Sequence, residues 1–121
     1  MHIQFSELPV TDQDRAKQFY SDALACSVVA DTAMSRDGWR WIELGLPGAE
    51  TNLHFIRRTD DKPAAEPVLV LVVDDVAGTV ASLRHRGVDI VTEPHSPVWE
   101  PSKTVAEFRD SEGNRLVLSN A

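Results

Sequence analysis

Two segments of the chain carry apolar residues at helical spacing, and eight others show the pattern of β-strands. The helical stripes consist of Ala16, Phe19, Tyr20, Ala23 and Leu24 in the first half and of Val76, Val80 and Leu83 in the second. Asp12 stands where an N-cap should, Asp74 and Asp75 precede the second stripe, and Gly87 stands where the second helix should end. The predicted strands cover residues 3–10, 27–31, 38–45, 51–58, 67–73, 88–91, 104–109 and 115–119.

The order of these elements repeats along the chain. Each half contains a strand, a helix and three further strands, and the motif Val-x-Asp opens both helices, at Val10 and again 63 residues later at Val73. The polar, proline-bearing stretch 59–66 separates the halves. The sequence therefore predicts an α+β fold in a single domain, 1–121, that consists of module one at 1–58, a linker at 59–66 and module two at 67–121.

Alternation along the strands separates two faces of each predicted sheet. One face carries leucine and phenylalanine residues such as Leu8, Leu53, Phe55 and Leu116, and we expect the helices to cover it. The opposite face carries Phe5, Glu7, His54, Val68, Val70, Val72 and Val117. A surface that mixes polar and apolar side chains in this way is typical of a small-molecule pocket.

Composition narrows the class of protein. The 121 residues carry a net charge of −7, which argues against a nucleic-acid partner because phosphate binding needs a basic face. The single cysteine, Cys26, excludes an intrachain disulfide and any metal cluster built only from cysteines, as in a reducing cytoplasm. We see no signal peptide, and the longest apolar run, 68–73, is too short to cross a bilayer. We expect a cytoplasmic protein without a membrane partner.

Four stretches of the chain, 8–24, 38–55, 72–88 and 108–118, carry a resemblance to a known family. Its more specific parts are the Phe-Tyr pair at the end of the first helix and the Asp-x-x-Gly-Asn turn before the last strand. In order and spacing the chain resembles the vicinal oxygen chelate superfamily, also called glyoxalase/bleomycin-resistance/dioxygenase proteins. The segment 24–26 departs from the family, which usually has Leu-Gly-aromatic there. The resemblance implies two βαβββ modules that form a cupped mixed sheet, and we expect a homodimer to cover the exposed edges.

The resemblance also locates the positions that bind a metal ion in metal-dependent members. Carried over strand by strand, these positions are Phe5, His54, Val68 and Val117. Only His54 can donate to a metal, whereas a divalent site needs at least three nitrogen or oxygen donors. We therefore expect no metal and no other cofactor, and neither glyoxalase I nor extradiol dioxygenase chemistry.

The candidate ligand-binding residues each have a structural alternative. His54 would serve as a polar anchor or general base, or would be satisfied by a neighbouring strand. Glu7 would pair with His54 or would be a solvated carboxylate. Trp39 and Trp41 would wall a ligand or pack at a subunit interface. Trp99, in a proline-rich loop, would belong to a lid or anchor that loop. Phe5, Val68 and Val117 would complete the apolar floor.

The leading hypothesis is metal-free binding of a small, partly aromatic organic molecule, as in the drug-binding branch of the resembled family. The alternative is a metal-dependent lyase, isomerase or dioxygenase that uses His54 with Glu7 or Glu107. A regulatory or interaction module is a third possibility. Metal analysis separates the first two hypotheses, and a titratable small-molecule ligand would argue against the third.

Overall fold

A computed structural model describes residues 1–34 and 36–121, which divide into two compact units, 1–62 and 63–121. The division lies inside the segment that the sequence assigns to the linker. Each unit contains one helix and four strands in the order strand, helix, strand, strand, strand. The predicted α+β fold of two βαβββ modules is therefore confirmed.

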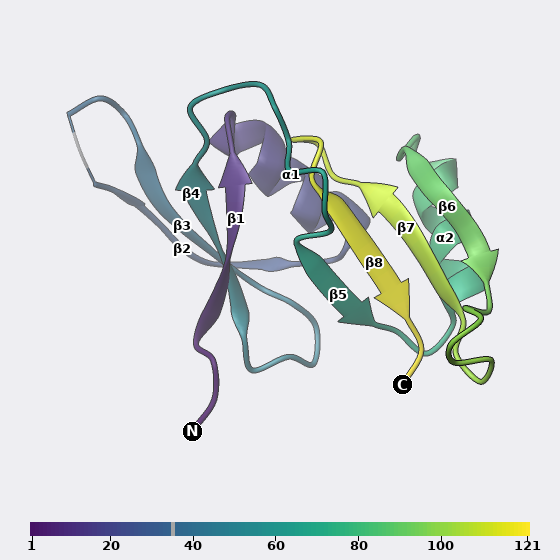
Figure 1. Ribbon diagram of the computed structural model, residues 1–121. Helices are drawn as coiled ribbons and strands as arrows, with labels where there is room; N and C mark the ends of the chain where they lie inside the picture. Colours follow the sequence, from purple (N-terminus) through teal and green to yellow (C-terminus); the bar gives the residue numbers. More distant parts are fainter. Residues whose placement is uncertain (35) are drawn as a thin grey trace. The chain divides into compact units, whose positions relative to one another are not determined.

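The first unit comprises β1 (Phe5–Val10), α1 (Gln13–Ala23), β2 (Ser27–Ala33), β3 (Arg40–Gly45) and β4 (Asn52–Arg57). Its four strands form a sheet in the order β1-β4-β3-β2 (Figure 1). The pair β1–β4 is parallel, because the chain returns to β1 only after the helix and two further strands, and the other pairs are antiparallel. The sheet is therefore mixed, with β2 at one edge.

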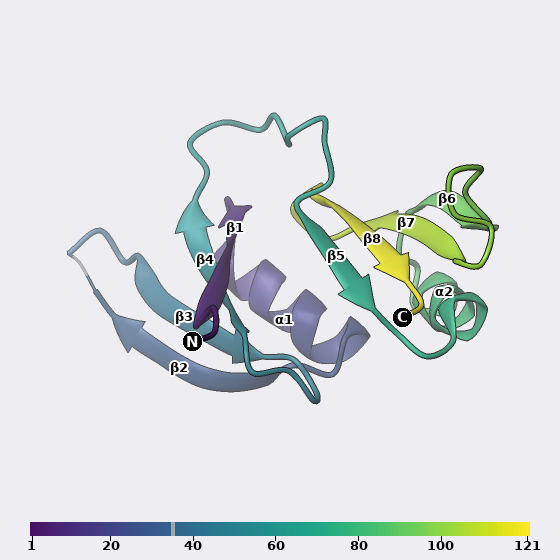
Figure 2. The ribbon, with the colours of Figure 1, turned by 60° about the horizontal axis from the view of Figure 1, so that its bottom comes forward.

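The second unit repeats this topology with β5 (Leu69–Val72), α2 (Val76–His85), β6 (Ile90–His95), β7 (Val105–Arg109) and β8 (Arg115–Ser119). The strand order β5-β8-β7-β6 matches that of the first unit position by position, and α2 lies along β6 and β7 (Figure 2). The sequence repeat thus corresponds to two units of the same topology.

Both helices begin at the predicted aspartates. The Asp12 carboxylate accepts a hydrogen bond from the Arg15 N–H (3.0 Å), and the Asp75 carboxylate accepts one from the Gly78 N–H (2.9 Å). These bonds satisfy N–H groups that a first helical turn leaves unpaired. Gly87 follows α2 with φ +79°, a left-handed conformation that glycine adopts without strain.

The strand alternation predicted from the sequence is confirmed by burial. In the first unit Leu8, Leu53 and Phe55 are buried together with Tyr20 of α1, whose ring centroid lies 6.0 Å from that of Phe55. In the second unit the buried strand residues are Ala106, Phe108, Leu116 and Leu118, and the buried helix residues are Val76, Val80 and Leu83. In each unit one face of the sheet packs on the helix, which leaves the other face available for function.

Most strands differ from prediction by one or two residues at an end, and two of them, β3 and β6, differ for a reason that the structure shows. The strand expected at 38–45 begins at Arg40, because the Asp37 carboxylate accepts the Trp39 N–H (3.0 Å) and turns the backbone there. The strand expected at 88–91 instead covers Ile90–His95, and its irregular pairing with β7 tolerates Pro94 near its end.

A buried glutamine holds the start of β3. The pairing between β3 and β4 covers only Glu43–Gly45, and at Arg40 the Gln13 side chain takes the place of a strand. Its Nε2 donates to the Arg40 carbonyl (2.6 Å), and the Arg40 N–H donates to its Oε1 (2.9 Å). Since Gln13 is only 7% exposed, this pair of bonds fixes the backbone next to Trp41.

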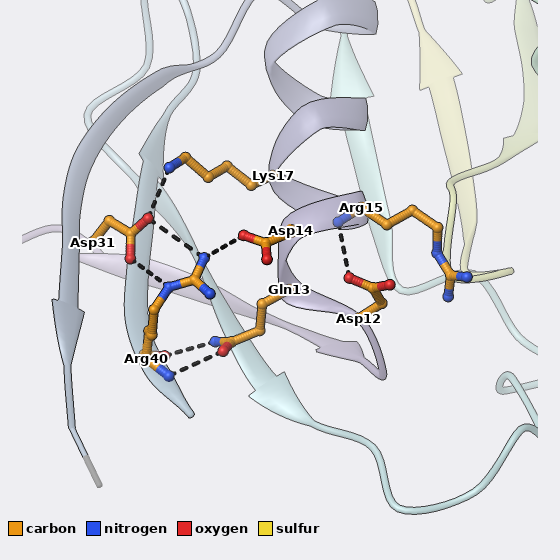
Figure 3. A network of polar contacts seen from close by, with 7 residues as sticks. All are labelled: Asp12, Gln13, Asp14, Arg15, Lys17, Asp31 and Arg40. Carbon is orange, nitrogen blue, oxygen red and sulfur yellow. Dashed lines mark hydrogen bonds and ion pairs between the residues drawn. The ribbon is translucent and has the colours of Figure 1, made fainter. Parts of the chain in front are cut away.

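The side chain of Arg40 joins a charged network that links α1, β2 and β3 (Figure 3). Its Nε lies 2.8 Å from the Asp31 carboxylate and its Nη2 lies 2.6 Å from that of Asp14, while Lys17 Nζ contacts Asp31 at 2.7 Å. Hydrogen bonds from Arg40 and then from Lys17 lower the pKa of Asp31 below its usual 3.8. The ionised carboxylate of Asp31 thus favours the folded state.

Because the pKa of Asp31 is lower in the folded than in the unfolded chain, its contribution to stability should be complete above pH 3.8 and disappear as the pH falls through the folded-state value. We expect the difference in unfolding free energy between the wild type and Asp31→Asn to shrink over that acid range. Urea unfolding at a series of pH values measures it, with Asp22→Asn on the exposed side of α1 as the control. A difference that does not change with pH would contradict this role of Asp31.

Candidate ligand-binding face

Six side chains gather on the side of the first sheet opposite α1. They are Phe5 and Glu7 of β1, Trp41 and Glu43 of β3, and Asn52 and His54 of β4, and we call them the aromatic–acidic face. Strand register brings them together, because Glu7 and Glu43 are the partners of His54 on its two neighbouring strands. Side chains at paired positions point to the same side of a sheet.

Three rings form the centre of this face. The imidazole of His54 stacks on the indole of Trp41, with ring centroids 3.8 Å apart and planes 29° apart. The Phe5 ring lies edge to face with Trp41, with ring centroids 5.7 Å apart. It is tilted against the imidazole of His54, with centroids 5.1 Å apart. Such ring pairs add about 0.5–1.5 kcal/mol each beyond the area they bury, so they hold the imidazole in one orientation.

The imidazole has an unmet hydrogen bond. His54 is 7% exposed, and its Nδ1 is buried without a hydrogen-bond partner. The nearest carboxylate oxygen is Oε2 of Glu7, at 3.6 Å, which is too long for a direct hydrogen bond. A polar atom placed beside both groups would satisfy Nδ1 and contact Glu7, whose side chain is 51% exposed.

Glu43 is fixed by its neighbours. Its Oε2 accepts a hydrogen bond from Asn52 Nδ2 (2.6 Å), and its Oε1 accepts one from the indole N–H of Trp41 (3.4 Å). A buried carboxylate needs such partners to offset the loss of water. Glu43 therefore contributes a fixed negative charge and helps to orient the indole.

The structure brings together four of the residues predicted for the site. Phe5, Glu7, Trp41 and His54 contact one another as described above. Trp39, which the sequence places on one strand face with Trp41, precedes β3 and stacks on the Arg57 guanidinium at 4.7 Å. Trp39 thus lies just outside β3, and its role as a wall of the ligand site stays a prediction.

The remaining predicted residues belong to the second unit. Val68 and Val117 are half-buried, and Val117 pairs with Val70 on the sheet face opposite α2. Val70 and Val72 are 64% and 66% exposed there. Trp99 is 83% exposed in the turn between β6 and β7, so it does not anchor its loop by burial.

Sequence reasoning missed Glu43 and Asn52. The signal was available, because each lies two residues from a predicted site residue on the same strand, Glu43 from Trp41 and Asn52 from His54. Without the register between β3 and β4, nothing in the sequence showed that these two side chains would bond to each other.

The donor atoms do not fit the metal centre of the resembled family. Phe5, Val68 and Val117 provide none, and the Phe5 ring packs against His54 with ring centroids 5.1 Å apart. No group of three or more His, Cys, Asp or Glu side chains suited to a metal occurs in residues 1–34 and 36–121. Glu107, an alternative ligand, is held by Arg115 Nη2 at 2.6 Å in the second unit.

Comparison with known proteins gives the family. The model of the Glyoxalase/Bleomycin resistance protein/Dioxygenase superfamily matches residues 2–118. The chain belongs to this superfamily. The resemblance inferred from the sequence motifs is thereby confirmed, and so is the fold, because solved structures of superfamily members align with nearly the whole chain.

Several known proteins are similar to this chain along most of their length. The Bacillus subtilis (strain 168) protein YetH is 30% identical over 111 residues, which are 90% of this chain and 89% of YetH. TnmS3, an antibiotic binding protein from Streptomyces sp. CB03234, is 31% identical with a TM-score of 0.81, over 99% of this chain and 95% of its own. A glyoxalase/bleomycin resistance protein from the same Streptomyces is 29% identical with a TM-score of 0.77, over 98% of this chain and 100% of its own.

The described residues contain no helix that is both long and apolar enough to span a membrane. α1 and α2 have 11 and 10 residues, about half the length that a bilayer requires.

Proposed function

We propose that the protein binds a small, partly aromatic organic molecule on the aromatic–acidic face without a metal ion. One observation carries this proposal: the Nδ1 atom of His54 is buried without a hydrogen-bond partner, and the imidazole contacts the rings of both Trp41 and Phe5. Leaving such an atom without a partner costs about 1–3 kcal/mol. A ligand that offers a polar atom to Nδ1 and a flat apolar surface to the rings recovers that cost.

The similarity to TnmS3 supports this choice among the functions found in the superfamily. TnmS3 is described as an antibiotic binding protein, and at 31% identity it aligns with almost the entire chain. The side chains at the metal positions of the superfamily also support metal-free binding, because His54 is the only one of the four with a donor atom. Binding rather than metal-assisted chemistry therefore fits this chain best.

Tryptophan fluorescence tests the proposal directly. In a Trp39→Phe/Trp99→Phe background the remaining indole is that of Trp41, so quenching during a screen of aromatic metabolites and antibiotics reports on this face. We expect hits with micromolar affinity that weaken about tenfold or more in His54→Ala, because the polar anchor is lost. His85→Ala, which removes an exposed histidine from the end of α2, is the matched control. Hits that bind His54→Ala as tightly as the parent would overturn the proposal.

The metal-free character of the site has its own test. After supplementation with Ni²⁺, Zn²⁺, Fe²⁺ or Mn²⁺ and dialysis, elemental analysis of the untagged protein should find no stoichiometric metal, because Phe5, Val68 and Val117 lack donors. Prior treatment with a chelator should leave ligand affinity unchanged. Retention of about one equivalent of metal that is lost in His54→Ala would contradict the proposal.

We also propose that the protein is a homodimer. β2 forms an edge of the first sheet, and its Val28 and Val29 are exposed, as are Val70 and Val72 of the second. A second copy would cover such edges and apolar side chains. Light scattering at micromolar concentration should give about twice the 13.4 kDa chain mass. A monomer throughout that range would be inconsistent with a dimer.

A further inference from the structure

We propose that the ligand of the aromatic–acidic face carries a protonated nitrogen attached to its flat ring system, and that Glu7 receives this group. This inference rests on the proposed function and specifies the chemical class of the ligand. It starts from the distribution of charge around His54.

Carboxylates lie on both sides of the imidazole. The register of the sheet sets Glu7 of β1 opposite His54 of β4, and Glu43 of β3 opposite the same histidine on its other side. The row across three neighbouring strands is therefore carboxylate, imidazole, carboxylate. A ligand that settles on the rings of this face meets negative charge from two directions.

Three basic side chains of the first unit pair with aspartates. Lys17 and Arg40 pair with Asp31, and Arg40 also reaches Asp14. Arg57 pairs with Asp37 at 2.8 Å while it stacks on Trp39. These three cations are therefore paired with aspartates and not with Glu7 or Glu43.

The two carboxylates, Glu43 and Glu7, differ in burial and in hydrogen-bond partners. Glu43 is buried, and each of its oxygens already accepts a hydrogen bond, one from Trp41 and one from Asn52. Glu7 is half exposed, and its Oε2 stands 3.6 Å from His54 Nδ1, which leaves it open to a group from solvent. An incoming N–H can donate to Glu7.

A protonated nitrogen fits both the hydrogen-bonding groups and the negative charge around His54. It donates one hydrogen bond to Glu7 and another to the lone pair of His54 Nδ1 when the imidazole proton is on Nε2. Its charge is also attracted to the face of an aromatic ring such as that of Phe5. A neutral hydroxyl can meet the hydrogen bonds but gains nothing from the charge, and a carboxylate is repelled. The expected order of affinity is cation, then neutral molecule, then anion.

Three probes with the same ring test this order. Naphthylmethylamine, naphthylmethanol and naphthylacetic acid carry an ammonium, a hydroxyl or a carboxylate group, respectively, on the same naphthylmethyl scaffold at neutral pH. Titration calorimetry should show the amine binding about tenfold more tightly than the alcohol, with an advantage that declines as salt is added, and the acid binding least. Glu7→Gln should remove most of the advantage of the amine while changing the affinity for the alcohol less than about twofold.

Glu50→Gln is the matched control, since it removes the same charge from an exposed loop of the same unit and should preserve the preference. Equal affinity for the three probes, or tighter binding of the alcohol or the acid, would overturn the inference and leave the proposed function standing if Trp41→Ala abolishes binding. Failure of all three probes at millimolar concentration would also overturn it, and the Trp41 fluorescence screen would then decide the proposed function separately.

Discussion

Replacing Trp41 with alanine should weaken ligand binding by about thirtyfold or more, which corresponds to about 2 kcal/mol, because a central aromatic residue usually dominates the energy of a binding surface. The substitution removes the ring on which His54 stacks at 3.8 Å and the N–H that donates to Glu43. The ligand would lose its flat contact, and the imidazole would lose its fixed orientation.

Titration calorimetry with the tightest ligand from the screen measures this effect, and Trp39→Ala is the matched control. Trp39 lies two residues away but stacks on Arg57, so its removal should change affinity less than about twofold. Thermal unfolding of both variants checks that the fold survives. If Trp39→Ala weakens binding as strongly as Trp41→Ala, the ligand does not lie on the aromatic–acidic face as defined.

Replacing Phe55 with alanine should lower the free energy of unfolding by about 3–5 kcal/mol, the range for a fully buried phenylalanine. Phe55 is completely buried and packs against Tyr20. Phe5→Ala, on the other side of the same sheet, should cost only about 1 kcal/mol because its ring is half-buried. Ligand affinity should fall strongly in Phe5→Ala and change little in Phe55→Ala.

Urea unfolding and calorimetric titration of the two phenylalanine variants give both quantities. For Phe55→Ala the binding measurement is made at low temperature, where the variant remains folded. A similar loss of stability in both variants would mean that the two faces of the first sheet do not divide into a core side and a ligand side.

The parts of the fold that depend on local rules could be predicted from the sequence. Asp12 and Asp75 cap the helices because a carboxylate before an apolar stripe satisfies free N–H groups at short range. Strand alternation correctly predicted Leu53 and Phe55 in the core and His54 on the opposite face. These signals extend over only a few residues, so no knowledge of distant neighbours was needed.

The parts of the site that depend on strand pairing could not be predicted in the same way. Glu43 and Asn52 meet because β3 and β4 pair in one particular register, and a shift of β3 by one residue would have turned Glu43 to the core side, away from Asn52. Trp39 lies outside β3 because the Asp37 carboxylate accepts its N–H and turns the backbone there. Gln13 replaces a missing strand partner at Arg40, which no periodicity indicates.

A crystal structure of the chelator-treated protein with its tightest ligand tests the central claim most directly. We expect the ligand to lie on the aromatic–acidic face, in contact with the rings of Trp41 and Phe5, with a polar atom within hydrogen-bond distance of His54 Nδ1 and no metal ion between them. A ligand bound elsewhere on the protein, or held to His54 through a metal ion that the protein retains, would contradict the account.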